Sequence, residues 1–433
     1  MAMPSRGFIL FTQEHFEVSC MDMEVINYFI TQTNNLLLPF VQATAPLWSM
    51  LLFGYIGVTV WMTYIRTKKI QDTGSVLLEI KLPKEVLKSP RAMELVLVAL
   101  YQKGNANLIE TYWDGKFIPW YSLELVSIGG EVHFFIWTQP KMREIIETQI
   151  YAQFPTVEIF EVDDYTKDVK HNNDSRGMWG TYFKLTKADP FPIKTYVDYG
   201  LDTDPKEEFK IDPMATVVEY LGSLKKGEQA WIQILIQAHK KQEFKDGRLF
   251  TKDDWGKEGK MEIDKIRAEA TPPKVAGNDF PGFPNPTKGQ VEQIAAIERS
   301  LDKFAFETGI RAFYIAENDS FNEVNIPGLI GCFKQYSSNT MLNGFKLGWF
   351  TDFDYPWQDF RRMRRNRDER MMLDAYKRRS FFYSPYKHFH SKPFILTTEE
   401  LATIFHFPGS TVATPTFKRV LSKKVEAPSN LPT

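Results

Sequence analysis

The 433-residue sequence has little cysteine and almost no excess of charge of either sign. Cys20 and Cys332 are its only cysteines, which argues against a disulfide framework and excludes a cysteine-rich zinc site. Lys and Arg total 53 and Asp and Glu total 54, giving a formal net charge of -1. The chain as a whole therefore has no general attraction for polyanions, and an electrostatic partner must be bound by a local patch.

The common catalytic signatures are also missing. No stretch fits the phosphate loop G-x-x-x-x-G-K-[ST], the metalloprotease motif H-E-x-x-H, the hydrolase motif G-x-S-x-G or the dinucleotide motif G-x-G-x-x-G. We therefore predict that the chain is not an enzyme and that it has no cofactor and no metal.

His388 and His390 form an H-x-H pair, which on a strand would place both rings on one side and could hold a metal. No cluster of further ligands accompanies them in the sequence. We interpret them as structural or surface histidines, and the pair is the sole support for an enzyme with an unfamiliar site. The acidic pairs Asp163-Asp164 and Asp253-Asp254 are interpreted as solvated loops.

Charged residues are absent from the stretch 25–65, and this absence predicts a membrane helix. Residues 45–65 alone would form a helix of about 30 Å, the thickness of the hydrocarbon layer. Aromatic residues suited to the interface lie near its ends, and basic residues follow it. The predicted anchor residues are Trp48, Trp61, Tyr64, Arg66, Lys68 and Lys69.

The flanking charges predict the orientation of this helix. Arg6 is the only Lys or Arg before the span, whereas Arg66, Lys68 and Lys69 follow it directly. The positive-inside rule then places the N-terminal segment 1–44 outside and the long C-terminal part in the cytoplasm, as a single-pass protein of the cytoplasmic (inner) membrane. A cleaved signal peptide fits poorly, because no basic region precedes the apolar run. Met21 and Met23 are alternative start positions.

The remaining sequence predicts an α+β fold that contains two similar modules. Residues 74–165 have the order βαββαβ, with Ser89 and Pro90 opening the first helix and Gly129-Gly130 in a hairpin. This order is that of the ferredoxin-like split βαβ unit. Residues 180–350 repeat it, with Asp212 and Pro213 opening the corresponding helix and Ile232, Ile234 and Ile236 alternating onto one face of a strand.

The second module carries an insertion near 244–287. Its second part is rich in proline and glycine, so we predict a mobile loop, which either contacts a partner or is simply disordered.

The segment 351–390 combines basic and aromatic residues in the strongest local charge feature of the chain. Arginine with aromatic residues can bind phosphates and stack on bases. The alternatives are a salt-bridged helix surface, a face resting on anionic lipid headgroups, or a protein contact, and we favour the lipid and protein contacts together over nucleic acid. The predicted patch comprises Arg361, Arg362, Arg364, Arg365, Arg367, Arg370, Lys377, Arg378 and Arg379.

The C-terminal segment 391–433 is predicted to form a short helix followed by a proline-containing linker. Thr397 and Glu400 have the spacing of a capping box, and Pro408-Gly409 would end the helix. This segment, with "DPMATVVEYLGSLKKGEQAWIQILIQ", resembles the N-terminal membrane-anchored region of conjugative type IV secretion ATPases of the coupling-protein kind. In that family the phrase resembling "EELATIFHFPG" leads to a motor domain, whereas this chain ends at Thr433 with no motor motifs.

The resemblance implies a role near DNA or protein translocation, and no nucleotide-binding residue can be carried over. Our first hypothesis is a non-catalytic, membrane-anchored scaffold or docking subunit, with the lipid bilayer and a translocation ATPase or a second copy of the chain as partners. The alternative is a membrane-tethered nucleic-acid-binding protein.

Overall fold

The computed structural model describes residues 14–83, 88–104, 106–171, 175–202, 211–240, 255–271, 285–353 and 355–409. The chain divides into two units, residues 1–64 and residues 65–433. One helix, α1 (Glu14–Thr73), forms the described part of the first unit and ends inside the second.

Helix α1 is longer at both ends than the predicted span of residues 45–65. Its segment Pro39–Thr73 is long and apolar enough to cross a membrane, and no residue of its most apolar stretch is buried. The helix stops where Gly74 adopts a left-handed φ of 70° and its N–H bonds back to the carbonyl of Ile70. Glycine favours this termination because it has no Cβ. The basic residues after Ile65 end the apolar run without ending the helix.

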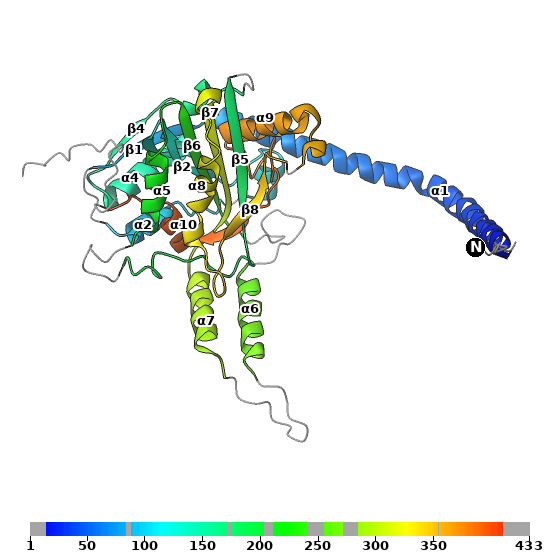
Figure 1. The fold of residues 1–433 in the computed structure, drawn as a ribbon. Coiled ribbons are helices and arrows are strands. Elements are labelled where there is room, and N and C mark those ends of the chain that lie inside the picture. The colour runs from blue at the N-terminus through cyan, green and yellow to red at the C-terminus, as the bar shows by residue number, and fades with distance from the viewer. Residues whose placement is uncertain are drawn as a thin grey trace, which may run out of the picture. The chain divides into compact units, whose positions relative to one another are not determined.

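Nine strands of the described chain form one sheet in which every pairing is antiparallel (Figure 1). The strands are β1 (Val76–Lys81), β2 (Trp120–Ile128), β3 (Glu131–Thr138), β4 (Glu158–Glu161), β5 (Arg176–Leu185), β6 (Glu228–Ala238), β7 (Ala305–Glu317), β8 (Phe345–Phe350) and β9 (Phe394–Thr397). Their order is β4-β1-β3-β2-β6-β7-β5-β8, and β9 pairs with β7.

The two halves of this sheet are joined, whereas the sequence suggested separate modules. Strands β2 and β6 pair along their whole length, from Trp120 opposite Gln237 to Ile128 opposite Gln229. Both strands are almost entirely buried. If β2 or β6 were an unpaired edge strand, its buried backbone N–H and C=O groups would lack hydrogen-bond partners. Pairing the two strands supplies partners for the backbone groups of both.

Helices cover both faces of the sheet (Figure 1). The helices of the first face are α2 (Pro90–Ala99), α4 (Arg143–Gln153), α5 (Pro213–Gly222), α8 (Asn325–Gly331) and α10 (Thr398–Ile404). The opposite face carries α9 (Met363–Lys377), and the short helix α3 (Leu108–Tyr112) lies in the connection before β2. Ile232, Ile234 and Ile236 share the first face, which confirms the predicted alternation.

The insertion predicted as a loop contains a helix. Helix α6 (Trp255–Glu269) pairs with α7 (Lys288–Leu301) in a two-helix arm that projects from the sheet (Figure 1). Ile263 and Ile266 lie one turn apart and pack with Ile297 of α7, and this small apolar stripe is what holds the charged helix in place. Residues 244–254 and 272–284 lie outside the described residues.

Candidate interaction surface

A row of polar side chains crosses the sheet beneath α9, at positions that are opposite one another in register. Glu124 on β2 faces Gln233 on β6, and Gln233 faces Arg311 on β7. All three are fully buried. Gln233 Nε2 donates to Glu124 Oε1 over 2.6 Å, and Arg311 Nε donates to Gln233 Oε1 over 2.5 Å. A buried polar group is costly unless it is hydrogen-bonded. The residues of this row therefore need further partners from the segment that covers this part of the sheet.

The segment after α9 supplies those partners. Arg379 donates from Nε to Glu124 Oε1 over 2.9 Å and from Nη2 to Glu124 Oε2 over 3.1 Å. Arg379 also pairs with Asp164, and Arg311 donates to the backbone carbonyl of Ala375 over 2.8 Å. The polar row therefore fixes the C-terminal end of α9 on the sheet.

This contact corrects two sequence-based interpretations. Arg379 was expected in an exposed basic patch, but its side chain has no exposed surface because it neutralises Glu124. Asp164 was expected in a solvated loop, but its carboxylate accepts from Thr166 N and pairs with Arg379. Burial opposes the charged form of Asp164, yet Arg379 and Thr166 together hold its pKa below the ordinary value.

Two further members of the predicted patch are half-buried and engaged in holding α9. Arg365 pairs with Glu369 over 2.8 Å and with Asp352 over 2.8 Å. Lys377 donates to the carbonyl of Val169 over 2.6 Å. Met372, Leu373 and Tyr376 complete the inner face of the helix against the sheet.

The remaining arginines form one exposed surface, which we call the arginine face. Residues 364, 367, 370 and 378 lie close to the three- and four-residue spacing of one helix side, and two more arginines precede the helix. The arginine face consists of Arg361, Arg362, Arg364, Arg367, Arg370 and Arg378, all exposed. Three of them have carboxylate or histidine contacts within or beside the helix, namely Arg367 with Asp368, Arg370 with His171 and Arg378 with Asp374.

Large apolar side chains stand exposed beside the start of α9, and we call them the apolar ledge. The ledge consists of Tyr355, Trp357, Phe360 and Met363, of which Trp357 is 78% exposed and Phe360 69% exposed. Tyr355 and Trp357 stack with centroids 4.7 Å apart, and Arg361 lies 5.1 Å from the Phe360 ring centroid. Arg361 and Arg362 both adopt left-handed φ values, a strained backbone that bends the chain between ledge and helix. A group of exposed aromatic residues next to arginines is typical of an interaction surface.

The predicted membrane-anchor residues all lie on α1. Trp48, Trp61 and Tyr64 are exposed, as are Lys68 and Lys69, and Arg66 is half-buried. Ile65 is buried, and the backbone of Ile65 lies so close to Gly115 that a Cβ there would come within 2.8 Å of the Ile65 carbonyl carbon. The last two turns of α1 are thus packed against the sheet domain.

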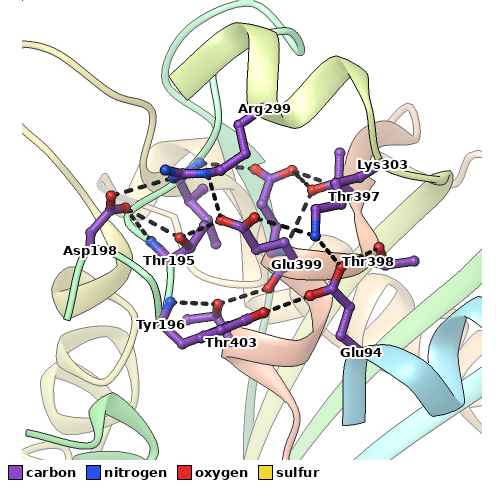
Figure 2. A network of polar contacts seen from close by, with 12 residues as sticks. Glu94, Thr195, Tyr196, Asp198, Arg299, Lys303, Thr397, Thr398, Glu399 and Thr403 are labelled. Carbon is purple, nitrogen blue, oxygen red and sulfur yellow. Dashed lines mark hydrogen bonds and ion pairs between the residues drawn. The ribbon is translucent and has the colours of Figure 1, made fainter. Parts of the chain in front are cut away.

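A second polar network, at the opposite face of the sheet, holds α10 in place (Figure 2). Lys303 Nζ lies 2.7 Å from Glu94 Oε1, and Arg299 Nε lies 3.2 Å from Glu399 Oε1. Thr398 Oγ1 donates to Glu94 Oε1 over 3.2 Å. Helices α2, α7 and α10, which are far apart in the sequence, are joined here by charge-assisted hydrogen bonds.

The predicted capping box at the start of α10 is confirmed. Thr397 accepts from Glu400 N, and Glu400 accepts from Thr397 N over 2.8 Å. Glu400 also accepts from the backbone N–H of Ile193 over 2.9 Å. Burial raises the pKa of Glu400 to about 7. The linker predicted after α10 lies outside the described residues from 410 onward.

The H-x-H pair is not on a strand. His388 and His390 both have left-handed φ values, and His390 stacks on Trp349 with centroids 4.0 Å apart. They line an open pocket together with Lys184, Lys187 and Lys392. Among the residues that the structure describes, no three His, Cys, Asp or Glu side chains are grouped as metal ligands would be.

A family model described as "Domain of unknown function (DUF8128)" matches residues 72–419, well over half of the chain. The chain belongs to this family. The match begins at the last residues of α1 and includes the sheet, α9 and α10, so the family domain contains both polar networks and leaves the apolar part of α1 outside. No curated protein matches the sequence.

Membership of this family does not identify functional residues. The sequence also did not single out the buried polar row. Glu124, Gln233 and Arg311 did not stand out in the sequence. A glutamate between two leucines in "WYSLELVSI" and an arginine between apolar residues in "IRAFYIA" are the signal that could have revealed buried charges.

Proposed function

We propose that this chain is a single-pass, membrane-anchored, non-catalytic scaffold or docking subunit. The observation that carries the proposal is α1, because an exposed apolar helix of membrane-spanning length runs without a break into turns that pack on the sheet domain. The distribution of basic residues around the span supports a location in the cytoplasmic membrane with the N-terminus outside.

The fold proposed for the sheet domain is two ferredoxin-like modules joined edge to edge. Strand order β4-β1-β3-β2 in the first half is matched by β8-β5-β7-β6 in the second. Each half runs strand, helix, strand, strand, helix, strand, and the second half has α6 and α7 inserted between its two middle strands. The β2–β6 pairing then relates the halves by an approximate two-fold axis.

The surfaces fit a docking role. The arginine face and the apolar ledge combine positive charge with interfacial aromatic residues, a composition suited to anionic lipid headgroups. The α10 network fixes the point from which residues 410–433 continue, and the resemblance to type IV secretion ATPases makes a translocation ATPase the proposed partner, with a second copy of this chain as the other candidate.

Membrane fractionation of cells that express the full chain tests this function. The protein should stay with the membranes after washing at alkaline pH and should be released by detergent, and the purified protein should not hydrolyse ATP. Recovery in the soluble fraction without detergent would refute the anchor, and hydrolysis in the purified sample would refute the non-catalytic role.

The arginine face also supports a second candidate, a membrane-tethered nucleic-acid-binding protein. Phosphate contacts by several arginines would make binding fall steeply with salt. The test is an oligonucleotide shift assay at low and at physiological ionic strength. Binding that disappears with Arg364→Gln and Arg367→Gln would favour this candidate, and the absence of any shift at low salt would remove it.

A further inference from the structure

A cavity of about 300 Å³ lies between the last two turns of α1 and the C-terminal end of α9, a volume at the lower end of the range for small-molecule sites. Several segments of the sheet domain line it. They are the end of α1 and the residues after it (Thr67, Ile70, Gln71, Gly74, Ser75), the start of β2 (Phe117, Trp120), the end of β3 (Trp137, Gln139), Asp164, and the end of α9 with the segment that follows (Lys377, Arg378, Ser380, Phe381, Tyr383, Ser384, Pro385).

The inner walls of this cavity are aromatic, and their polar atoms are already used by the protein. Trp120 Nε1 donates to the carbonyl of Arg379 over 3.1 Å, and the Tyr383 hydroxyl accepts from Ile118 N over 3.0 Å. Phe117 lies edge-on to both rings, with centroids 5.5 Å and 5.8 Å away. What these residues offer a ligand is therefore ring surface, which binds an apolar group.

Two basic side chains line the cavity, Lys377 and Arg378, and Arg378 also pairs with Asp374 over 2.8 Å. The lining carboxylate is Asp164, which Arg379 neutralises from the buried side. Burial lowers the pKa of Lys377, so an anion at this position would be favoured because it compensates a partly desolvated ammonium group. Gln71, Ser75 and Ser384 add hydrogen-bonding side chains.

We propose that this cavity binds the headgroup end of an anionic phospholipid. The phosphate lies against Lys377 and Arg378, and the glycerol and first acyl carbons lie on the aromatic walls. The source of the ligand follows from the cavity's own wall, because one side is the helix that continues into the apolar span, which makes membrane lipid the amphipathic phosphate compound at highest local concentration. The inference rests on the proposed membrane anchorage.

The test uses the full chain in detergent, with native mass spectrometry and a titration of short-chain phosphatidylglycerol. Lys377→Gln with Arg378→Gln should weaken binding at least about tenfold, since both cations near the anionic headgroup are removed. Gln71→Trp, at an exposed helical position, should block the cavity without disturbing the fold. Arg367→Gln with Arg370→Gln removes the same charge from the same helix outside the cavity and should leave binding unchanged.

Each outcome decides the proposal. One saturable phosphatidylglycerol per chain, lost only in the cavity variants, supports it. Equal loss in both double variants, or equal binding of phosphatidylcholine, would show general surface attraction and overturn it. Glycerol phosphate binding as tightly as the lipid would overturn the lipid source. The cavity variants keep α1 and should remain in the membrane fraction, so loss of this inference is distinguishable from loss of the anchor.

Discussion

Glu124 and Arg379 form a two-point ion pair in which neither side chain has any exposed surface. The pair joins the central strand β2 to the turn that follows α9, 255 residues further along the chain. A buried pair of this kind adds little stability compared with apolar residues of similar size, but removing one partner leaves an uncompensated charge. Here the pair fixes the position of α9, because this helix can lie on the sheet only where Arg379 contacts Glu124.

Arg379→Met should destabilise the sheet domain by about 3–5 kcal/mol, since Glu124 would remain buried without its main cationic partner. Chemical denaturation followed by near-UV circular dichroism measures this change. The double variant Glu124→Gln, Arg379→Met should recover part of the loss because position 124 then no longer carries a buried, unpaired negative charge. A single variant as stable as the wild type would contradict the pairing.

Gly115→Ala should loosen the end of α1 from the sheet domain. The added Cβ would meet the Ile65 backbone at 2.8 Å, and Gly115 has a φ of 66°, which is unfavourable for alanine by about 1–2 kcal/mol. Tryptic cleavage after Lys68 and Lys69 should become faster. Gly54→Ala is the matched control, because a Cβ there has nothing within 4 Å. Equal cleavage rates in the two variants would refute the contact.

The stability of the α10 attachment should fall as pH rises from about 4.5 to about 7. Burial raises the pKa of Glu400 to about 7, above its ordinary 4.5, so the folded state holds this proton where the unfolded state has lost it. The contribution of protonated Glu400 to the free energy of unfolding is fully present below pH 4.5 and declines by roughly 3 kcal/mol by pH 7. Glu400→Gln should remove this decline, apart from a constant offset for one altered hydrogen bond. Parallel stability curves for the two proteins would contradict it.

His406 should add a pH dependence of the same sign. Burial opposes its charged form, but the Asp212 carboxylate at 3.1 Å outweighs burial and raises the pKa of His406 above 6.5. Its stabilisation is present below pH 6.5 and is lost as pH rises through the higher folded value. In Asp212→Asn, an NMR titration should give His406 a pKa lower than in the wild type. An unchanged titration would show that the carboxylate does not control this histidine.

Trp357→Ala with Phe360→Ala should leave the unfolding free energy within about 0.5 kcal/mol of wild type, because both side chains are mostly exposed. If the apolar ledge contacts the membrane, a polarity-sensitive dye attached to Trp357→Cys should shift to the blue in vesicles with anionic lipid. The same dye on Met261→Cys, exposed on the α6 arm, should not shift. A dye at position 357 that reports water in every lipid would exclude this contact.

The element order was predictable from sequence because the local signals were strong. Two helix starts are marked by local signals, the Asp212 cap followed by Pro213 and the Thr397–Glu400 capping box, and both are found in the structure. The alternation of Ile232, Ile234 and Ile236 predicts which face of the strand is buried, and it is also found. The β2–β6 pairing was not predictable, since two buried edge strands carry no sequence mark of which strand each will meet. The helix α6 was missed because its apolar stripe is only one turn wide among charged residues.

The sequence located the basic and aromatic residues of the segment 351–390 but could not show which of them are exposed. A count of basic residues cannot distinguish Arg379, which is buried against a glutamate 255 positions earlier, from Arg367, which is exposed. That distinction depends on tertiary pairing. Exposure of Trp357 and Phe360 is likewise a property of the folded surface, because aromatic residues beside a helix start are more often part of a core.

Cysteine accessibility tests the central claim, a membrane-anchored chain with its sheet domain inside, most directly. Cys332 is buried and its thiol pKa is raised to about 12, so it should not react, and Cys20→Ser provides a silent background. In that background a membrane-impermeant maleimide should label Asn35→Cys in intact cells and should label Ser75→Cys only after lysis. Labelling of both positions, or of Ser75→Cys alone, in intact cells would contradict the account.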